Sequence, residues 1–99
     1  MDRIYELVKV SYKLAINNRY TEELQEMACK DPKWAYYYAS DVKGADIEYC
    51  QKAACKDPEW AYYFARDVKG ADLDVCLEAV RGSEWEDEVR KMVIESGVG

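Results

Sequence analysis

The sequence predicts an all-α fold, a right-handed α-solenoid of stacked helical hairpins with a 26-residue repeat and about seven helices. Three observations predict it. The chain matches itself at a shift of 26 residues, each matching segment holds two stretches of apolar residues at helical spacing, and helix-starting residues precede those stretches. Self-similarity at a period of about 20–50 residues is typical of stacked helical units.

The repeat covers the middle of the chain. Residues 28–39 match residues 54–65, and residues 41–47 match residues 67–73. We therefore expect one domain over residues 1–99. Its predicted parts are a divergent N-terminal hairpin (1–30), two repeats (31–56 and 57–82) and a C-terminal capping helix (83–99).

Each repeat is expected to form two helices. In the second repeat, Asp57 followed by proline is a helix start, because Asp accepts an unpaired N–H group and proline has none to pair. This helix is predicted over residues 58–68, with Gly70 as the left-handed residue that ends it. Asp72 caps a second helix over residues 73–80. The first repeat carries the same signals at Asp31, Pro32, Gly44 and Asp46.

Each predicted helix has one narrow apolar stripe. The stripe positions follow i, i+3, i+4 and i+7 spacing, and neither helix can bury its stripe alone, so the hairpins must stack. In the second repeat the stripes are Ala61, Phe64, Ala65 and Val68, then Leu73, Cys76, Leu77 and Val80.

The ends are divergent versions of the same pattern. The first helix is expected over residues 2–16, with Tyr12 and Ile16 in the places of the second repeat's buried aromatic residue and its valine. Asn18 replaces the left-handed glycine, and a partner helix begins near Thr21. At the other end, Ser83 and the glutamate three residues later form a capping box before a last helix over residues 84–95.

The pattern resembles the helical-hairpin repeat class that includes tetratricopeptide and HEAT arrays, over nearly the whole chain. The motif Asp-Pro-x-Trp-Ala-Tyr-Tyr-x-Ala-x-Asp-Val-Lys-Gly-Ala-Asp also resembles repeats of uncharacterised bacterial and phage proteins. The sequence departs from a true tetratricopeptide, since its period is 26 and not about 34 residues and the Gly-x-x-Tyr signature is absent. The class implies protein binding along a groove and carries no catalytic residues across.

The charge and hydropathy of the sequence argue against some classes of binding partner. The net charge is −6, with 14 basic and 20 acidic residues, and the acidity lies in residues 54–99. This balance argues against direct binding of nucleic acid and of anionic membranes, which needs clustered Lys and Arg. No apolar stretch is long enough to span a membrane and no targeting segment is visible, so we expect a cytoplasmic protein with reduced thiols.

The best candidate binding residues are aromatic. Trp34, Tyr36 and Tyr37 recur one repeat later, and Tyr and Trp dominate the hot spots of protein interfaces. The tryptophans are expected to seal the joints between hairpins. Two aspartates late in the first helix of each repeat are expected either to bond a neighbouring Tyr or Trp or to contact a cation of a ligand. The candidate binding residues are Tyr36, Tyr37, Tyr62, Tyr63, Arg66, Asp41 and Asp67.

No residue set predicts catalysis, a metal or a cofactor. The chain has no His and no Cys-x-x-Cys, and equivalent cysteines of stacked hairpins lie about 8–10 Å apart, beyond disulfide reach. We interpret Cys29, Cys50, Cys55 and Cys76 as small buried apolar residues.

Three functions remain open from the sequence. The first is a non-enzymatic protein-binding module that uses the Tyr/Trp face. The second is a small acidic inhibitor, of the phage or anti-CRISPR kind, that occupies the nucleic-acid channel of a target protein. The third is a structural unit that forms homo-oligomers through its end helices.

Overall fold

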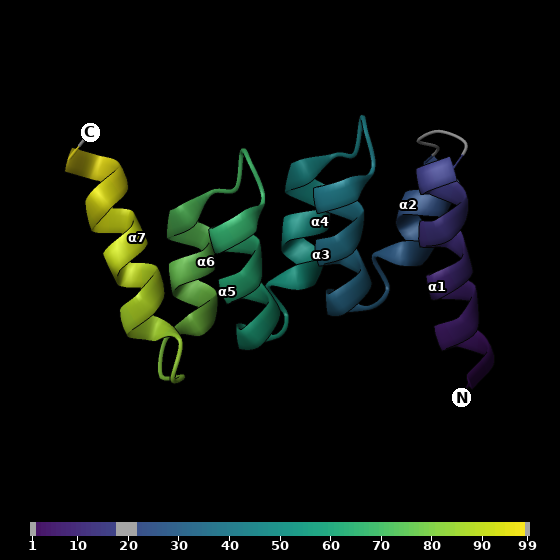
Figure 1. Ribbon diagram of the computed structural model, residues 1–99. Helices are drawn as coiled ribbons and strands as arrows, with labels where there is room; N and C mark the ends of the chain where they lie inside the picture. Colours follow the sequence, from purple (N-terminus) through teal and green to yellow (C-terminus); the bar gives the residue numbers. More distant parts are fainter. Residues whose placement is uncertain (1, 18–21, 99) are drawn as a thin grey trace.

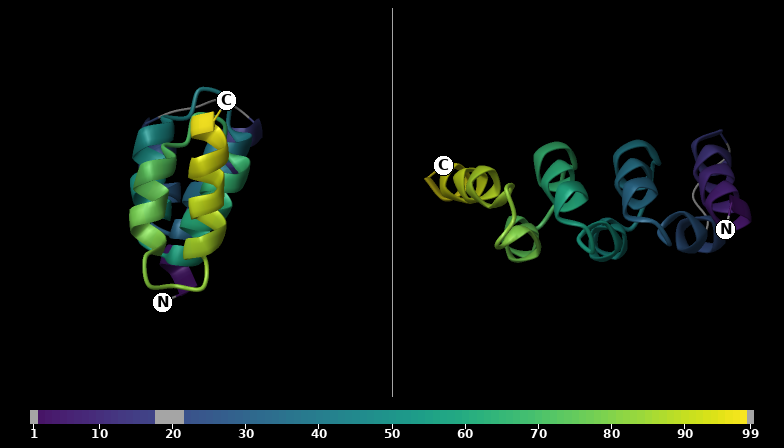
Figure 2. Two further views of the ribbon diagram at one scale, coloured as in Figure 1. Left: turned by 90° about the vertical axis from the view of Figure 1, so that its left-hand side faces the viewer. Right: turned by 90° about the horizontal axis from the view of Figure 1, so that it is seen from below.

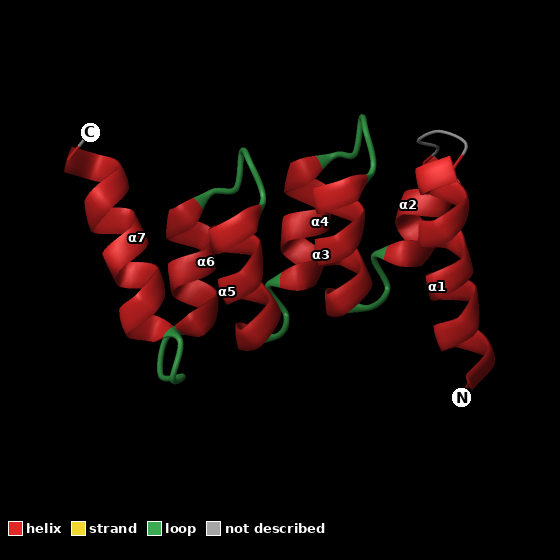
Figure 3. Cartoon of the chain, in the orientation of Figure 1, coloured by secondary structure: helices red, strands yellow, loops and turns green. Residues whose placement is uncertain are grey.

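The computed structural model describes residues 2–17 and 22–98, and this part of the chain is all-α, with seven helices and no strand (Figure 3). Asn18 and Thr21, predicted as a cap and a helix start, lie outside the described residues. The helices are α1 (Asp2–Asn17), α2 (Glu22–Ala28), α3 (Pro32–Asp41), α4 (Ile47–Ala54), α5 (Pro58–Asp67), α6 (Leu73–Val80) and α7 (Glu86–Val98).

The helices form two layers. The odd-numbered helices α1, α3, α5 and α7 stand in a row, and α2, α4 and α6 line the other side (Figures 1 and 2). Each odd-numbered helix contacts the next odd-numbered one and its neighbours in sequence, and the whole is a slab of 39 × 30 × 14 Å. Because the helices pack within a hairpin and against the neighbouring hairpin, a surface can extend along the whole row.

Aspartate caps start the middle helices as predicted. The Asp31 carboxylate accepts a hydrogen bond from the Lys33 N–H at 2.9 Å, and Asp57 accepts one from Glu59 at 2.9 Å. Asp46 and Asp72 cap α4 and α6 in the same way. These bonds satisfy N–H groups that have no partner within the helix, which is why both repeats fix their helices at equivalent positions.

The first helix of each repeat ends differently from the prediction. Val68 is extended and ends α5, so Gly70 is not the residue that closes the helix. The Ala71 N–H instead bonds the Val68 carbonyl at 3.3 Å, which makes residues 68–71 a tight turn with Gly70 third, at φ +88°. That position needs a positive φ, which glycine adopts at little cost. Gly44 occupies the same place in the first repeat, at φ +87°.

The core lies between the layers. Among the described residues, the fully buried aromatic side chains are Tyr38 in α3 and Phe64 in α5, in one core with small side chains of the even-numbered helices such as Ala54 and Cys76. Val89 of α7 is also fully buried and closes this core at its C-terminal end.

The register predicted for α1 is wrong. Among the side chains of α1 that the structure describes, Val8 and Ser11 are buried, whereas Tyr12 is half-buried and Ile16 is 44% exposed. The prediction extended the 26-residue spacing across a segment of different length. It matched Tyr12 to Phe64 and not to Tyr62, and an error of two positions turns a helix by about 200°, which exchanges its buried and outer faces.

The start of α7 also differs from the prediction. The helix begins at Glu86, because residues 83–86 first form a turn in which the Glu86 N–H bonds the Ser83 carbonyl at 3.3 Å. The Ser83 hydroxyl accepts a bond from the Trp85 N–H at 3.2 Å. The Glu86 carboxylate reaches back to the Gly82 N–H at 3.0 Å, so the two halves of the capping box bond groups one residue earlier than expected.

None of the helices within residues 2–17 and 22–98 combines the length and the apolarity needed to cross a bilayer.

Candidate functional site

Nine aromatic side chains form one connected row along the odd-numbered helices. Neighbouring rings lie with their centroids 4.8–6.3 Å apart, from α1 to the residue before α7. All reach solvent, eight of them half-buried and Tyr5 41% exposed. We call this surface the aromatic face. Its members are Tyr5, Tyr12, Trp34, Tyr36, Tyr37, Trp60, Tyr62, Tyr63 and Trp85.

The tryptophans seal the joints, as the sequence predicts. Trp34 of α3 lies against Tyr12 of α1, with ring centroids 5.1 Å apart. Trp60 of α5 lies against Tyr36 of α3 at 5.5 Å. The α1–α3 and α3–α5 joints are thus tilted aromatic pairs, a geometry that is favourable beyond the burial of area.

Each of these joints also carries a carboxylate. The Tyr12 hydroxyl donates a hydrogen bond to Asp41, and the Tyr36 hydroxyl donates one to Asp67. Of the two interpretations of the aspartates, the structure shows the bond to a tyrosine of the neighbouring hairpin. Tyr12 therefore contacts α3 in the way that Tyr36 contacts α5. It does not occupy the position in α1 that corresponds to the buried Phe64.

An arginine distinguishes the α3–α5 joint from the α1–α3 joint. Arg66 donates two bonds of 2.8 Å to Asp67, and its guanidinium lies 4.8 Å from the centre of the Tyr63 ring. The arginine bond holds the pKa of the Asp67 carboxyl below its usual value. Burial, and then the bond to Asp67, raise the pKa of Tyr36 to about 12. Ser40 stands at the equivalent position of the first repeat, so α3 has no such cation.

A shallow hollow of about 210 Å³ opens at the α3–α5 joint. Of the predicted binding residues, Tyr36, Tyr37, Tyr63 and Arg66 line it, together with Trp60 and Glu59. Its walls are ring faces and edges, with one acid and one base at the rim. The volume is below the roughly 300 Å³ at which small-molecule pockets begin, so the hollow suits one side chain of a larger partner.

The other predicted residues lie along the row rather than in the hollow. Asp67 stands beside it, bonded to two of its lining side chains. Asp41 is one joint earlier. Tyr62 is one joint later and stacks on Trp85, with centroids 4.8 Å apart and planes at 17°. This last joint has no aspartate seven residues after its tryptophan, because Met92 stands there.

Among residues 2–17 and 22–98, no group of three or more His, Cys, Asp or Glu side chains is placed to hold a metal ion.

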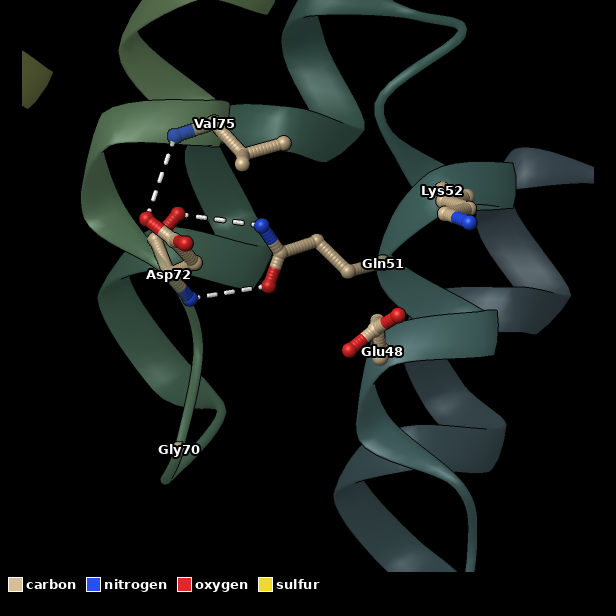
Figure 4. Close-up of a pocket in the computed structure, with 6 residues that line it drawn as sticks. All are labelled: Glu48, Gln51, Lys52, Gly70, Asp72 and Val75. Atoms are coloured by element: carbon tan, nitrogen blue, oxygen red, sulfur yellow. Dashed lines mark hydrogen bonds between the residues drawn. The ribbon is translucent and has the colours of Figure 1, made fainter.

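The other layer contains a polar contact that the sequence analysis missed. The Gln51 side chain accepts a bond from the Asp72 N–H at 2.8 Å and donates one to the Asp72 carbonyl at 3.0 Å (Figure 4). Gln25 accepts the equivalent bond from Asp46 at 2.8 Å. Both glutamines are 4% exposed. Their 26-residue separation was the available signal, since a glutamine that recurs at a buried position needs a partner.

An open pocket of about 410 Å³ lies beside this contact, between α4 and α6 (Figure 4). It carries one base, Lys52, against Glu48 and the Asp72 cap, and its single large apolar side chain is Val75. Asp72 is already committed to capping α6. The pocket therefore lacks the concentrated apolar lining of a ligand site.

The cysteines pair across the joints of this layer. The Cys29 and Cys50 sulfurs lie 3.5 Å apart, and Cys55 hydrogen bonds Cys76. These bonds and burial raise the pKa of Cys50 and of Cys76, whereas the bond from Cys76 lowers the pKa of Cys55. The prediction that no two thiols lie close did not include non-equivalent cysteines of neighbouring hairpins. The pairs that meet are non-equivalent, the last of one hairpin with the first of the next.

Comparison with known proteins adds no relative to this account. No protein family, no curated protein and no solved structure matches the chain.

Proposed function

We propose that the chain is a short right-handed α-solenoid of 26-residue hairpins, of the tetratricopeptide and HEAT-like class, and that it is a non-enzymatic module binding a protein partner across the aromatic face. One observation carries the proposal. Nine connected rings line one layer and all of them still reach solvent, although the core is already filled by Tyr38 and Phe64. Connected exposed aromatic surface is typical of interaction sites.

The chemistry of the rings supports a protein partner. Tyr and Trp give large contact areas at a low cost in side-chain entropy, and they can bury a ring while keeping a polar group bonded. In this face the hydroxyl of Tyr36 is already bonded to Asp67, and the Trp60 ring contacts both Tyr36 and Tyr63. A partner therefore meets a surface that is ordered beforehand, which lowers the entropy cost of binding.

The hollow at the α3–α5 joint defines the centre of the proposed interface. An apolar or aromatic side chain of the partner would fill it between Tyr36, Tyr63 and Trp60. Arg66 and Glu59 at the rim would bond polar groups of the partner backbone. Such an interface has an apolar anchor with a polar rim, the arrangement in which a few aromatic residues contribute most of the affinity.

The test is capture of a partner from the native cell's lysate at low and at high salt, with wild type and two double variants. Tyr36→Ala with Tyr62→Ala should remove the partner while circular dichroism shows a folded chain. Lys43→Ala with Lys69→Ala changes exposed residues of the inter-helix turns and should leave capture unchanged. Retention by the folded tyrosine variant would contradict the proposal.

A further pair of substitutions keeps the test valid should the tyrosine variant unfold. Glu59→Ala with Arg66→Ala changes only exposed side chains at the rim of the hollow. This variant should stay folded and weaken capture about tenfold or more, as removal of a hot-spot arginine does. Unchanged capture would place the interface elsewhere.

The second candidate is a small acidic inhibitor that occupies a nucleic-acid channel. The observation that favours it is the charge of residues 54–99, where Asp74, Glu78 and Asp87 are exposed. A basic channel would be attracted to this end, and the association would weaken steeply with salt. A captured nucleic-acid enzyme that is released by high salt and displaced by DNA or RNA would favour this function over the first.

A further inference from the structure

The odd-numbered helices share a register that defines where a preceding hairpin docks. In α3, Trp34 and Tyr37 come immediately before the buried residues Ala35 and Tyr38, and both contact Tyr12 of α1. Asp41 completes this seam at i, i+3, i+7 spacing. In α5 the same seam is Trp60, Tyr63 and Asp67, which receives Tyr36 of α3.

The corresponding side of α1 carries an apolar seam. Among the side chains of α1 that the structure describes, Val8 and Ser11 are buried. Leu7 and Val10 come immediately before them, and Leu14 follows at i+7 from Leu7, so these three lie on one side of the buried residues. These side chains are 53%, 46% and 44% exposed. Tyr12, which contacts α3, lies about 140° round the helix from Leu7 at about 100° per residue. The apolar seam therefore faces away from α3. The helix that carries it, α1, stands at one end of the row (Figure 1).

The opposite end of the row is mainly charged, with one exposed apolar side chain, Ile94. The outer side of α7 carries Asp87, Arg90 and Lys91, whose side chains are 85%, 50% and 71% exposed. Arg90 bonds Glu86 and Asp87 within the helix. Packing this surface against apolar side chains would remove these charges from water without new partners, which is costly. The α1 seam is therefore a poor match for the α7 end of another copy.

The α1 seam is self-complementary. A two-fold axis near Val10, relating two antiparallel α1 helices, places Leu7 of one chain opposite Leu14 of the other. Glu6 and Lys13 are exposed on one flank of the seam, and the same axis places Glu6 beside Lys13 of the second copy. The two-fold axis makes the contact between Glu6 and Lys13 twice. Apolar surface therefore meets apolar surface at the centre, and opposite charges meet at the rim.

We propose that the chain forms a homodimer through α1, antiparallel and two-fold, with Leu7, Val10 and Leu14 of each copy at its centre. The dimer is separate from the aromatic face and does not depend on the proposed partner. Three large apolar side chains per copy make a small interface, so the expected dissociation constant is on the order of micromolar. A two-fold interface uses the same patch on both chains and stops at two.

The first experiment is sedimentation of the reduced full chain from micromolar to near-millimolar concentration. Wild type should shift from monomer to dimer. Leu7→Glu with Val10→Glu should remain monomeric over the whole range, because four carboxylates would meet across the axis. Ile94→Glu on α7, where the side chain is 59% exposed, should dimerise as wild type does. All three should give the same helical circular dichroism spectrum, since the changed side chains are exposed.

A cysteine at the axis tests the geometry. Val10→Cys should give a covalent dimer on mild oxidation, seen on a non-reducing gel, because the two residues face each other across the axis. Ile94→Cys under the same treatment should stay monomeric. A wild type that is monomeric near millimolar concentration, or a dimer that survives Leu7→Glu with Val10→Glu, would overturn the proposal. So would a covalent dimer of Ile94→Cys formed as readily as that of Val10→Cys.

Discussion

The two layers join the same hairpins by different means. In the even-numbered layer, the joint between α4 and α6 is a glutamine with its amide bonded to the Asp72 backbone, beside the thiol pair of Cys55 and Cys76. In the odd-numbered layer, the joint between α3 and α5 is a set of rings with Asp67 and Arg66 at the surface. The first joint is buried and the second reaches water.

This difference separates the contacts that stabilise the fold from the surface that is proposed to bind a partner. A buried amide bonded on both sides cannot be changed without leaving polar groups unpaired, so the even-numbered joint is tied to the fold. The half-buried rings keep contact area available for another molecule. Side chains that seal a joint and still reach solvent can therefore be substituted to suit a different partner with less loss of stability. The predictions below test this separation.

The largest effect is expected in the core between the layers. Phe64→Ala removes a fully buried ring and should lower the free energy of unfolding by about 3–5 kcal/mol, because a cavity is left in its place. Urea unfolding followed by circular dichroism measures it. The matched control is Tyr63→Phe, one residue earlier on the exposed side, which should change the free energy by less than about 1 kcal/mol. Equal losses would show that the two faces of α5 are not distinct.

Oxidation should stabilise the even-numbered layer. Peroxide converts two adjacent thiols to a disulfide and is itself reduced to water. A Cys29–Cys50 bond would join residues 21 apart, which corresponds to about 3 kcal/mol of unfolding free energy when no strain opposes it. Mass spectrometry of peptides should find this pair and Cys55–Cys76. Links between the equivalent residues Cys29 and Cys55 would instead disprove the arrangement of the hairpins.

The next largest effect on stability is expected at the glutamine joint between α4 and α6. Gln51→Ala leaves the N–H and the carbonyl of Asp72 without their partner, and the expected loss is about 1–3 kcal/mol of unfolding free energy. Gln25→Ala should cost a similar amount, since its amide accepts the same bond from Asp46. Thermal unfolding of both variants beside wild type measures the change. A loss near zero would mean that water replaces the amide and that the joint contributes little to the fold.

The smallest effect on stability should come from the exposed polar pair. Asp67→Asn weakens surface bonds to Arg66 and Tyr36, for which about 0–1 kcal/mol is typical. The change should be clearer in titration. In wild type, Tyr36 ionises with a pKa of about 12, and Asp67→Asn should lower this value, as read from tyrosinate absorbance. The variant Tyr36→Phe lacks the Tyr36 hydroxyl and therefore identifies the part of the absorbance change that belongs to Tyr36. An unshifted titration would contradict the hydrogen bond.

The sign of the pH dependence follows from these shifts. Because the pKa of Tyr36 is raised on folding, its contribution to stability is complete below about pH 10, the usual tyrosine value, and is lost as pH rises through about 12. Because the pKa of Asp67 is lowered, its contribution is present above the usual carboxyl value and is lost as pH falls through the folded one. Asp67→Asn should flatten both limbs of the stability curve.

Local signals in the sequence located most of the middle of the fold. Asp57 with its proline and Asp72 each start a helix through bonds within three residues, so the helix starts at Pro58 and Leu73 were predictable. The register of α1 was not, because Tyr12 is placed by contacts with α3 that a repeat spacing does not encode.

The candidate site was also predictable only in part, because contacts between hairpins help to determine it. Recurrence of Tyr36 at Tyr62 predicted a row of rings, and the structure contains it. Which atoms meet across a joint depends on how far one hairpin is displaced along the next. That displacement brings Cys29 to Cys50 and Gln25 to the Asp46 backbone, and no local pattern specifies it.

The most direct test of the separation is oxidative footprinting of the chain with its captured partner. Both layers carry reactive aromatic side chains at the surface, Tyr63 and Trp60 on the aromatic face and Tyr49, 42% exposed, on α4. We predict that the partner protects Tyr63 and Trp60 from oxidation and leaves Tyr49 as reactive as in the free chain. Protection of Tyr49 with unchanged oxidation of Trp60 and Tyr63 would contradict the account and place binding on the even-numbered layer.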